Sequence, residues 1–242
     1  MSKTRPQMLG ITVLPEYFQV EGIEPVLDNC QYVAGANAIT TSPYVMRLAA
    51  DGEGQREPPV DAGAGAVRIL DRPLWGKREL QVSTSPSFHA NRSLYSKTCY
   101  EPPVGDRFTG ETGKIVAHAL ASIKQRGLSS YFQVQAAIPP GYRVQFSGVL
   151  EKDLPLLPNG QPVSNRVAKN ASLASEDILQ YQIALMIDLF QQYSDLDGIR
   201  IDWPEYPPYR LDSVFLDFNP QVESHCNSQQ SFQDIKNAIH EI

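Results

Sequence analysis

The sequence is poor in the residues that cross-link small folds or hold metal ions, with three cysteines and four histidines in 242 residues. Cys30, Cys99 and Cys226 are an odd number at wide, irregular spacing, which fits neither a disulfide framework nor a zinc site. The histidines form no H-E-x-x-H motif and no pairing with a carboxylate at metal-ligand spacing. We therefore expect reduced thiols, no metal site and no cofactor.

Basic runs and long hydrophobic runs are also missing. The formal net charge is -6, and nucleic-acid binding usually shows clustered lysine and arginine instead. No run of about 18 apolar residues could span a membrane. The start, MSKTRPQMLGITVLPEYF, enters a strand-like segment without a signal-peptide core. These absences predict a cytoplasmic protein with no nucleic-acid and no membrane partner.

Three common enzyme motifs are absent as well. A dinucleotide-binding fold needs G-x-G-x-x-G after the first strand, where this chain has LPEYFQVEG. No G-x-S-x-G elbow of a serine hydrolase and no G-x-x-x-x-G-K-[ST] phosphate loop occurs. The chemistry must therefore be sought in other residues.

What the chain does contain is alternation of apolar strands with amphipathic helices. With 42% hydrophobic and 20% charged residues, one soluble α/β domain over 1–242 is expected. A helix that Ser175 caps is the clearest element, because Glu176 and Asp177 follow at its positive end. Asn219 and Pro220 begin a last helix. Strands are predicted at 9–14, 36–41, 131–138 and 199–202, with VFLDF at 214–218 a doubtful fifth, and helices over 22–34, 111–127 and 175–193.

Two long insertions, at about 44–107 and 139–174, both follow strands. The first is expected to be a loop with a hairpin over 67–82. Alternating strands and helices imply parallel pairing, which allows a closed barrel or an open doubly wound sheet. Elaborated strand-to-helix loops favour a parallel (β/α) barrel of TIM type, which needs eight strands. The sequence predicts four of them, the N-terminal half, and open edges of this kind lead us to expect self-association.

Candidate chemistry lies in DGIRIDWPEYPPY, residues 197–209. Asp202 ends a strand, and Arg200 lies two residues earlier on the same side, where its charge would keep the carboxylate ionised. Glu205 follows in the next loop. Two carboxylates in different environments are what cleavage of a glycosidic bond requires. The alternative is a buried structural ion pair of Arg200 with Asp202, with Glu205 capping the next turn.

Other strand ends contribute further candidates. Glu16 stands at the mouth of the first strand and is the rival of Glu205 as the second carboxylate. Aromatic rings in these loops can be platforms for sugar rings, or can simply pack the loops. The candidate substrate-binding residues are Arg200, Trp203, Tyr206, Tyr17, Tyr44, Gln133 and Gln135.

The segment SLASEDILQYQIALMIDLFQQYSDLDGIRIDWPEYPP resembles the third helix and fourth strand of glycosyl-hydrolase-like TIM barrels. In those barrels a D-G-[IV]-[RH]-x-D-[WY] strand leads into a loop rich in proline and tyrosine. Gly198, Arg200 and Asp202 are also similar to the G-x-R-x-D strand of the α-amylase family. That resemblance implies that Asp202 is the nucleophile and Arg200 its partner, with the acid/base glutamate on a further strand.

These observations predict a glycoside-hydrolase-like barrel that binds and cleaves a carbohydrate. Two other functions remain possible from the sequence. A sugar isomerase or epimerase barrel would need a divalent metal held by histidine and carboxylates. A non-catalytic barrel would bind carbohydrate without turnover.

Overall fold

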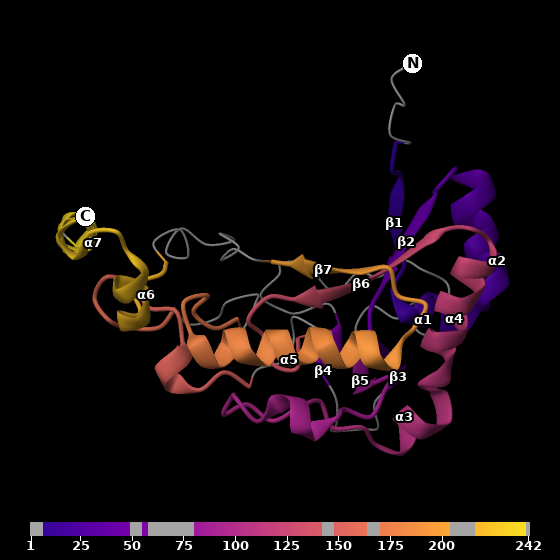
Figure 1. Ribbon diagram of the computed structural model, residues 1–242, viewed down its shortest axis with the longest axis horizontal. Helices are drawn as coiled ribbons and strands as arrows, with labels where there is room; N and C mark the ends of the chain where they lie inside the picture. The colour runs from indigo at the N-terminus through magenta and orange to yellow at the C-terminus, as the bar shows by residue number, and fades with distance from the viewer. Residues whose placement is uncertain are drawn as a thin grey trace.

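The computed structural model describes residues 7–48, 55–57, 80–141, 148–163, 170–203 and 216–240. Its centre is a four-stranded parallel sheet with the order β1-β2-β6-β7 (Figure 1). Within the described residues this sheet is open, with β1 and β7 as its edges. The α/β class and the parallel pairing are thus confirmed. The strands are β1 (Gly10–Thr12), β2 (Ala38–Thr41), β6 (Ser129–Gln135) and β7 (Gly198–Asp202).

All four predicted strands are present with shifted ends, and the largest change of boundary is in the third. The third was expected to run to residue 138, but β6 ends at Gln135. Ala137 has a φ of 54°, which is left-handed backbone that a strand cannot contain. Pro139 and Pro140 then remove two backbone donors.

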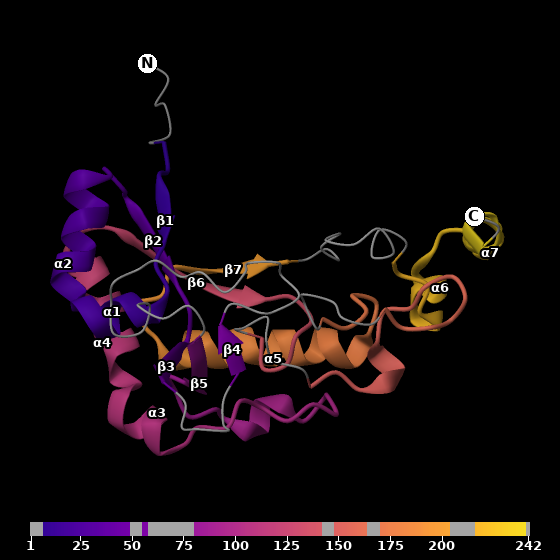
Figure 2. The same ribbon diagram turned by 180° about the vertical axis from the view of Figure 1, so that it is seen from behind.

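Helices cover one face of the sheet (Figures 1 and 2). That face is apolar, and Ile39, Phe132 and Val134 on it are completely buried. The helices are α1 (Pro15–Glu21), α2 (Ile23–Asp28) with a π turn over Asn29–Val33, α3 (Arg107–Thr112), α4 (Lys114–Gln125) and α5 (Glu176–Gln192).

The first helix differs from the single helix predicted over 22–34. Helical structure begins at Pro15, whose fixed φ suits a first turn, and Gly22 at a φ of 88° separates α1 from α2. Glu16 and Tyr17 were expected in a strand-end loop and instead lie in the first turn of α1. Pro15, which the sequence pattern indicated as the end of a strand, therefore also begins a helix.

The start of α5 is confirmed in detail. The Ser175 side chain accepts a hydrogen bond from the Ile178 N–H at 3.3 Å, as an N-cap does. Glu176 and Asp177 occupy the first turn. On the face toward the sheet, Leu185 and Leu189 are completely buried.

The insertion after β2 is more regular than predicted. It contains a second, antiparallel sheet of order β3-β5-β4, in place of an irregular loop with one hairpin. Tyr44, Val45 and Met46 are almost completely buried, which makes the first of its strands part of the core. Most of the hairpin expected at 67–82 lies outside the described residues. The strands are β3 (Tyr44–Leu48), β4 (Gln55–Glu57) and β5 (Leu80–Pro86), and the 3-10 turn η3 (Arg92–Tyr95) follows.

The C-terminal part extends beyond the sheet as two helices, α6 (Pro220–His225) and α7 (Gln229–His240) (Figure 1). Asn219 caps α6 as predicted, since its side chain accepts from the Gln221 N–H at 2.9 Å. Residues 216–218 of the doubtful fifth strand form no strand, and 214–215 lie outside the described residues. None of the described helices combines the length and the hydrophobicity that a membrane span requires.

Candidate active site

The second face of the parallel sheet is polar. Strand register places Thr12 beside Thr40, Thr40 beside Tyr131, and Gln133 beside Arg200. Because side chains alternate along a strand, these residues share the face opposite Ile39 and Phe132. The sequence therefore carries polar residues toward one side of the sheet and apolar residues toward the helices on the other.

Asp202 lies on this polar face, where β7 ends. The Gln133 amide donates a hydrogen bond to Asp202 Oδ2 at 2.7 Å from the neighbouring strand. The backbone carbonyl of Gln133 in turn accepts from the Ser42 hydroxyl at 3.1 Å. Asp202 is half-buried, so one oxygen is held while the carboxylate keeps access to solvent. The structure thus brings together two of the predicted site residues.

Arg200 does not pair with Asp202, contrary to both sequence interpretations. Among the described residues no ion pair joins them. The guanidinium instead donates to the Thr40 hydroxyl at 3.2 Å and to the Thr12 hydroxyl at 3.3 Å. Arg200 is also exposed, so a buried structural ion pair is excluded as well. Residues two apart on an extended strand point the same way but stand about 6.6 Å apart, and the threonines offer nearer acceptors.

The contact of Arg200 with Thr12 also shows how the sheet is shaped. β1 and β7 are the two edge strands of this sheet, so three strand spacings separate them. On a flat sheet this separation would be about 14 Å. A single side chain crosses this gap at a donor–acceptor distance of 3.3 Å. The sheet must therefore curl toward its polar face.

Glu16 is fully buried, with an exposed fraction of 0%. Its Oε2 accepts a hydrogen bond from the Tyr44 hydroxyl at 2.9 Å, and Tyr44 itself is 1% exposed. Neither side chain can meet a substrate in this arrangement, although both were candidates from sequence. Tyr17 is half-buried against the core. The first strand end thus carries a structural hydrogen bond between α1 and β3.

The Tyr44→Phe variant should lower the free energy of unfolding by about 1–3 kcal/mol, because it takes a donor from a buried carboxyl group. Chemical denaturation would measure the loss. Tyr32→Phe is the matched control, since Tyr32 is 72% exposed and its ring contact with Arg126 does not need the hydroxyl. Equal stability of the two variants would contradict a stabilising Glu16–Tyr44 bond.

Gln135 stands opposite Asp202 in the strand register. It is 7% exposed, and its Oε1 has no hydrogen-bond partner among the described residues. A buried unpaired amide oxygen is uncommon, and a ligand could pair with this one once the strand end opens. An acceptor for a hydroxyl group thus lies one strand away from Asp202.

The backbone is strained where β6 and β7 end. Ala137 and Trp203 both have a φ of 54°, a left-handed conformation that costs free energy in residues other than glycine and that recurs at functional sites. Trp203 directly follows Asp202 and is half-buried. Glu205 and Tyr206, the remaining candidates, lie outside the described residues.

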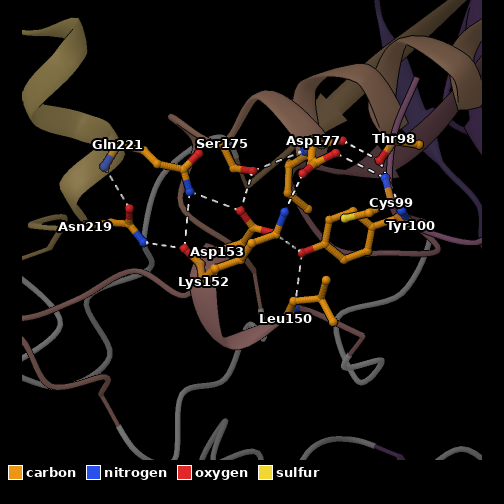
Figure 3. A network of polar contacts seen from close by, with 11 residues as sticks. Thr98, Cys99, Tyr100, Leu150, Lys152, Asp153, Ser175, Asp177, Asn219 and Gln221 are labelled. Atoms are coloured by element: carbon orange, nitrogen blue, oxygen red, sulfur yellow. Dashed lines mark hydrogen bonds and ion pairs between the residues drawn. The ribbon is translucent and has the colours of Figure 1, made fainter.

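A second polar cluster, centred on Asp153 in the turn η4 (Glu151–Asp153), was not predicted (Figure 3). Asp153 is 1% exposed. It accepts from the Tyr100 hydroxyl at 2.6 Å, the Ser175 hydroxyl at 2.7 Å and the Gln221 amide at 3.1 Å. Burial raises the pKa of the Tyr100 phenol above its ordinary value, so this hydroxyl stays protonated and donates. One carboxylate thus joins three separate segments.

Potential ligand atoms of Cys99, Asp153 and Asp177 in this cluster lie within 4.8 Å of one another. A cation already occupies the place, because Lys152 Nζ lies 2.5 Å from Asp177 Oδ2. Burial, with the Asp177 carboxylate nearby, raises the pKa of the Cys99 thiol, whereas a metal needs the thiolate. The cluster is therefore a structural network of hydrogen bonds and an ion pair.

A hollow of about 370 Å³ lies between the start of α5 and α6. Its wall is mainly apolar, with Leu173, Leu179 and Val222, and Glu176 and His225 stand at its exposed side. None of the site residues predicted from sequence lines it, so it is separate from the Asp202 site.

Comparisons with protein-family models, with curated proteins and with solved structures found no match. The resemblance to hydrolase-like barrels therefore rests on the residues of segment 172–208 alone.

Proposed function

We propose that this chain is the N-terminal half of a TIM-type β/α barrel that binds and cleaves a carbohydrate at its strand ends. The observation that carries the proposal is Asp202, held by Gln133 at the end of β7 on the concave polar face of a parallel sheet. In parallel barrels the active site is built at the carboxyl ends of the strands. Among the carboxylates of the described residues, Asp202 has this position and remains accessible to solvent.

The curl of the sheet supports the barrel part of this proposal. In a barrel the strands wrap around a common axis, and alternate side chains fill the interior. Thr12, Thr40 and Arg200, which meet on the concave side, would then be interior residues. The helices lie on the convex side, as they do in such barrels (Figure 2).

Asp202 would act as the nucleophile or as the charge that stabilises a developing oxocarbenium ion. Gln133 orients its carboxylate, and Gln135 would accept a hydrogen bond from a sugar hydroxyl. For the second carboxylate we favour Glu205, three residues after Asp202, over Glu16, because Glu16 is fully buried and held by Tyr44. Trp203 and Tyr206 would supply aromatic surface for a sugar ring.

The burial of Glu16 also favours one competing function, a carbohydrate-binding barrel without turnover. With Glu16 structural, catalysis depends on Glu205, or on a group beyond these strands, for the acid. Such a protein would keep the hydroxyl acceptors and aromatic rings yet release no product.

A direct test is hydrolysis of a panel of nitrophenyl glycosides and oligosaccharides, followed by nitrophenol and reducing-end release, with and without EDTA. The proposal expects turnover of at least one sugar class. EDTA should leave both the rate and the melting temperature unchanged, because the described residues place one carboxylate, Asp202, at the site, and hard divalent cations need several oxygen ligands. Saturable binding without turnover would favour the binding barrel. A rate that EDTA abolishes and a divalent ion restores would favour a metal-dependent isomerase.

A further inference from the structure

One side of α5 is hydrophobic and exposed along its whole length. The side chains of Leu179, Ile183, Ile187 and Phe190 follow helical spacing and are between 37% and 50% exposed. Between residues 178 and 194 the one charged residue is Asp188, and it is completely buried. A solvent-facing helix normally carries charges on its outer face, so this surface is typical of a covered one.

The same side of the molecule carries a free sheet edge. Among the described residues β7 pairs with β6 alone, and Ile201 on its helix-facing side is 48% exposed. β7 ends above the middle of α5 in both views (Figures 1 and 2). We call Ile201 and the four α5 residues the β7 flank. Here an unpaired strand edge and an apolar helix face lie together.

The opposite edge has a matching surface. Met8 and Leu9 lead into β1 and are 58% and 49% exposed. Tyr32 and Val33 end the helical segment before β2 and are 72% and 81% exposed. We call these four residues the β1 flank. Of the fourteen large hydrophobic side chains exposed among the described residues, nine belong to the two flanks.

We propose that two copies of this chain close into one eight-stranded barrel, with the β7 flank of each copy packed on the β1 flank of the other. β7 of one copy would pair in parallel with β1 of its partner, twice, around a two-fold axis along the barrel. The inference rests on the proposed half barrel and adds to it the identity of the covering surface.

Three observations favour this closed arrangement over two copies joined through α5 alone. The sheet is already curled toward its polar face, as the contact between Arg200 and Thr12 requires. The four strands of the parallel sheet in the described part of the chain are half of the eight that closure needs. A contact between two α5 helices would cover the β7 flank but leave the β1 flank exposed, whereas closure covers both and completes the ladder at both edges.

Closure would also complete the candidate site. The strand ends of both copies would surround one barrel mouth, which would then contain two Asp202 carboxylates on opposite sides. A substrate would meet residues of both copies, so activity and dimerisation should be lost together when a flank is changed.

The mass in solution tests the proposal first. Size-exclusion chromatography with light scattering of the 242-residue chain should give twice the mass of one chain, constant over a hundredfold range of concentration. A monomer would overturn the proposal. A mass that keeps growing with concentration would overturn closure, because head-to-tail contacts that do not close form open chains.

Two flank variants then test the pairing. Phe190→Asp on the β7 flank and Val33→Lys on the β1 flank should each raise the dissociation constant at least about 100-fold, because each places an unpaired charge in an apolar contact. Both side chains are exposed, so the subunit fold should survive, and circular dichroism would check it. Ile235→Asp is the matched control, since Ile235 is 55% exposed on α7 and should leave the dimer intact.

Mixing the two variants gives the decisive result. A mixed dimer has one junction with both flanks unchanged and one with opposite charges facing each other, whereas each single-variant dimer has two damaged junctions. Mixing should therefore restore dimers at concentrations where either variant alone is monomeric. No effect of Val33→Lys, or no recovery on mixing, would overturn the closed arrangement. None of these measurements uses catalysis, so they can fail or succeed independently of the glycosidase proposal.

Discussion

Replacing Asp202 with asparagine should lower glycosidase activity by about 10³-fold or more, which corresponds to about 4 kcal/mol of barrier. The reason is that asparagine is nearly isosteric but carries no charge and attacks an anomeric carbon poorly. Its side-chain oxygen can still accept the hydrogen bond from Gln133, so the strand end should keep its shape. The measurement is kcat/KM on the best substrate of the panel.

The matched control is Asp195→Asn, which makes the same change before β7 begins and should leave kcat/KM unchanged. Thermal unfolding should show that both variants are folded. If Asp202→Asn is folded and active, Asp202 is not the reacting carboxylate and the chemistry moves to Glu205. Loss of sugar binding together with activity would instead indicate that Asp202 positions substrate.

The strands were predictable from sequence because each is a short stretch with apolar residues that a proline follows closely. The cap of α5 was predictable because a serine followed by two acidic residues has a local physical meaning. The break between α1 and α2 was not, since Pro15 ends a strand and starts a helix equally well. Local patterns thus identified elements but not every boundary.

Side-chain pairing was harder to predict than the strands. Arg200 and Asp202 share a strand face, and spacing alone made them partners. The curl of the sheet decides otherwise, because it brings Thr12 and Thr40 within reach of the guanidinium. Curl depends on all four strands together, which no local pattern contains.

The Asp153 network was missed for a related reason. Asp153 lies in an irregular, proline-rich segment, and its partners Tyr100 and Gln221 are 53 and 68 residues away in the sequence. Neither helical nor strand periodicity marks such a residue. A signal exists only in three dimensions, where an almost completely buried carboxylate has three hydrogen-bond donors.

This burial leads to the largest stability effect that we expect. Asp153 joins the turn η4 to Tyr100 near the end of the first insertion, to the cap of α5 and to α6 (Figure 3). Asn219 reinforces the same junction by donating to the backbone carbonyls of Lys152 and Leu154 at 3.0 and 2.8 Å. Hydrogen bonds to a buried carboxylate are stronger than those to a neutral amide.

Asp153→Asn should therefore lower the free energy of unfolding by about 3 kcal/mol. The new amide NH2 group would face at least one of the three groups that now donate to Asp153, so at least one hydrogen bond would be lost. For a chain of this length the lower free energy of unfolding corresponds to a fall in melting temperature of roughly 10 °C. Glu151→Gln, an exposed change of the same kind in the same turn, is the control and should stay within about 0.5 kcal/mol of the unchanged protein. Equal melting temperatures for the two variants would show that Asp153 does not hold these segments together. Loss of hydrogen-exchange protection in α6 before the central strands would show that this junction is the first part of the fold to open.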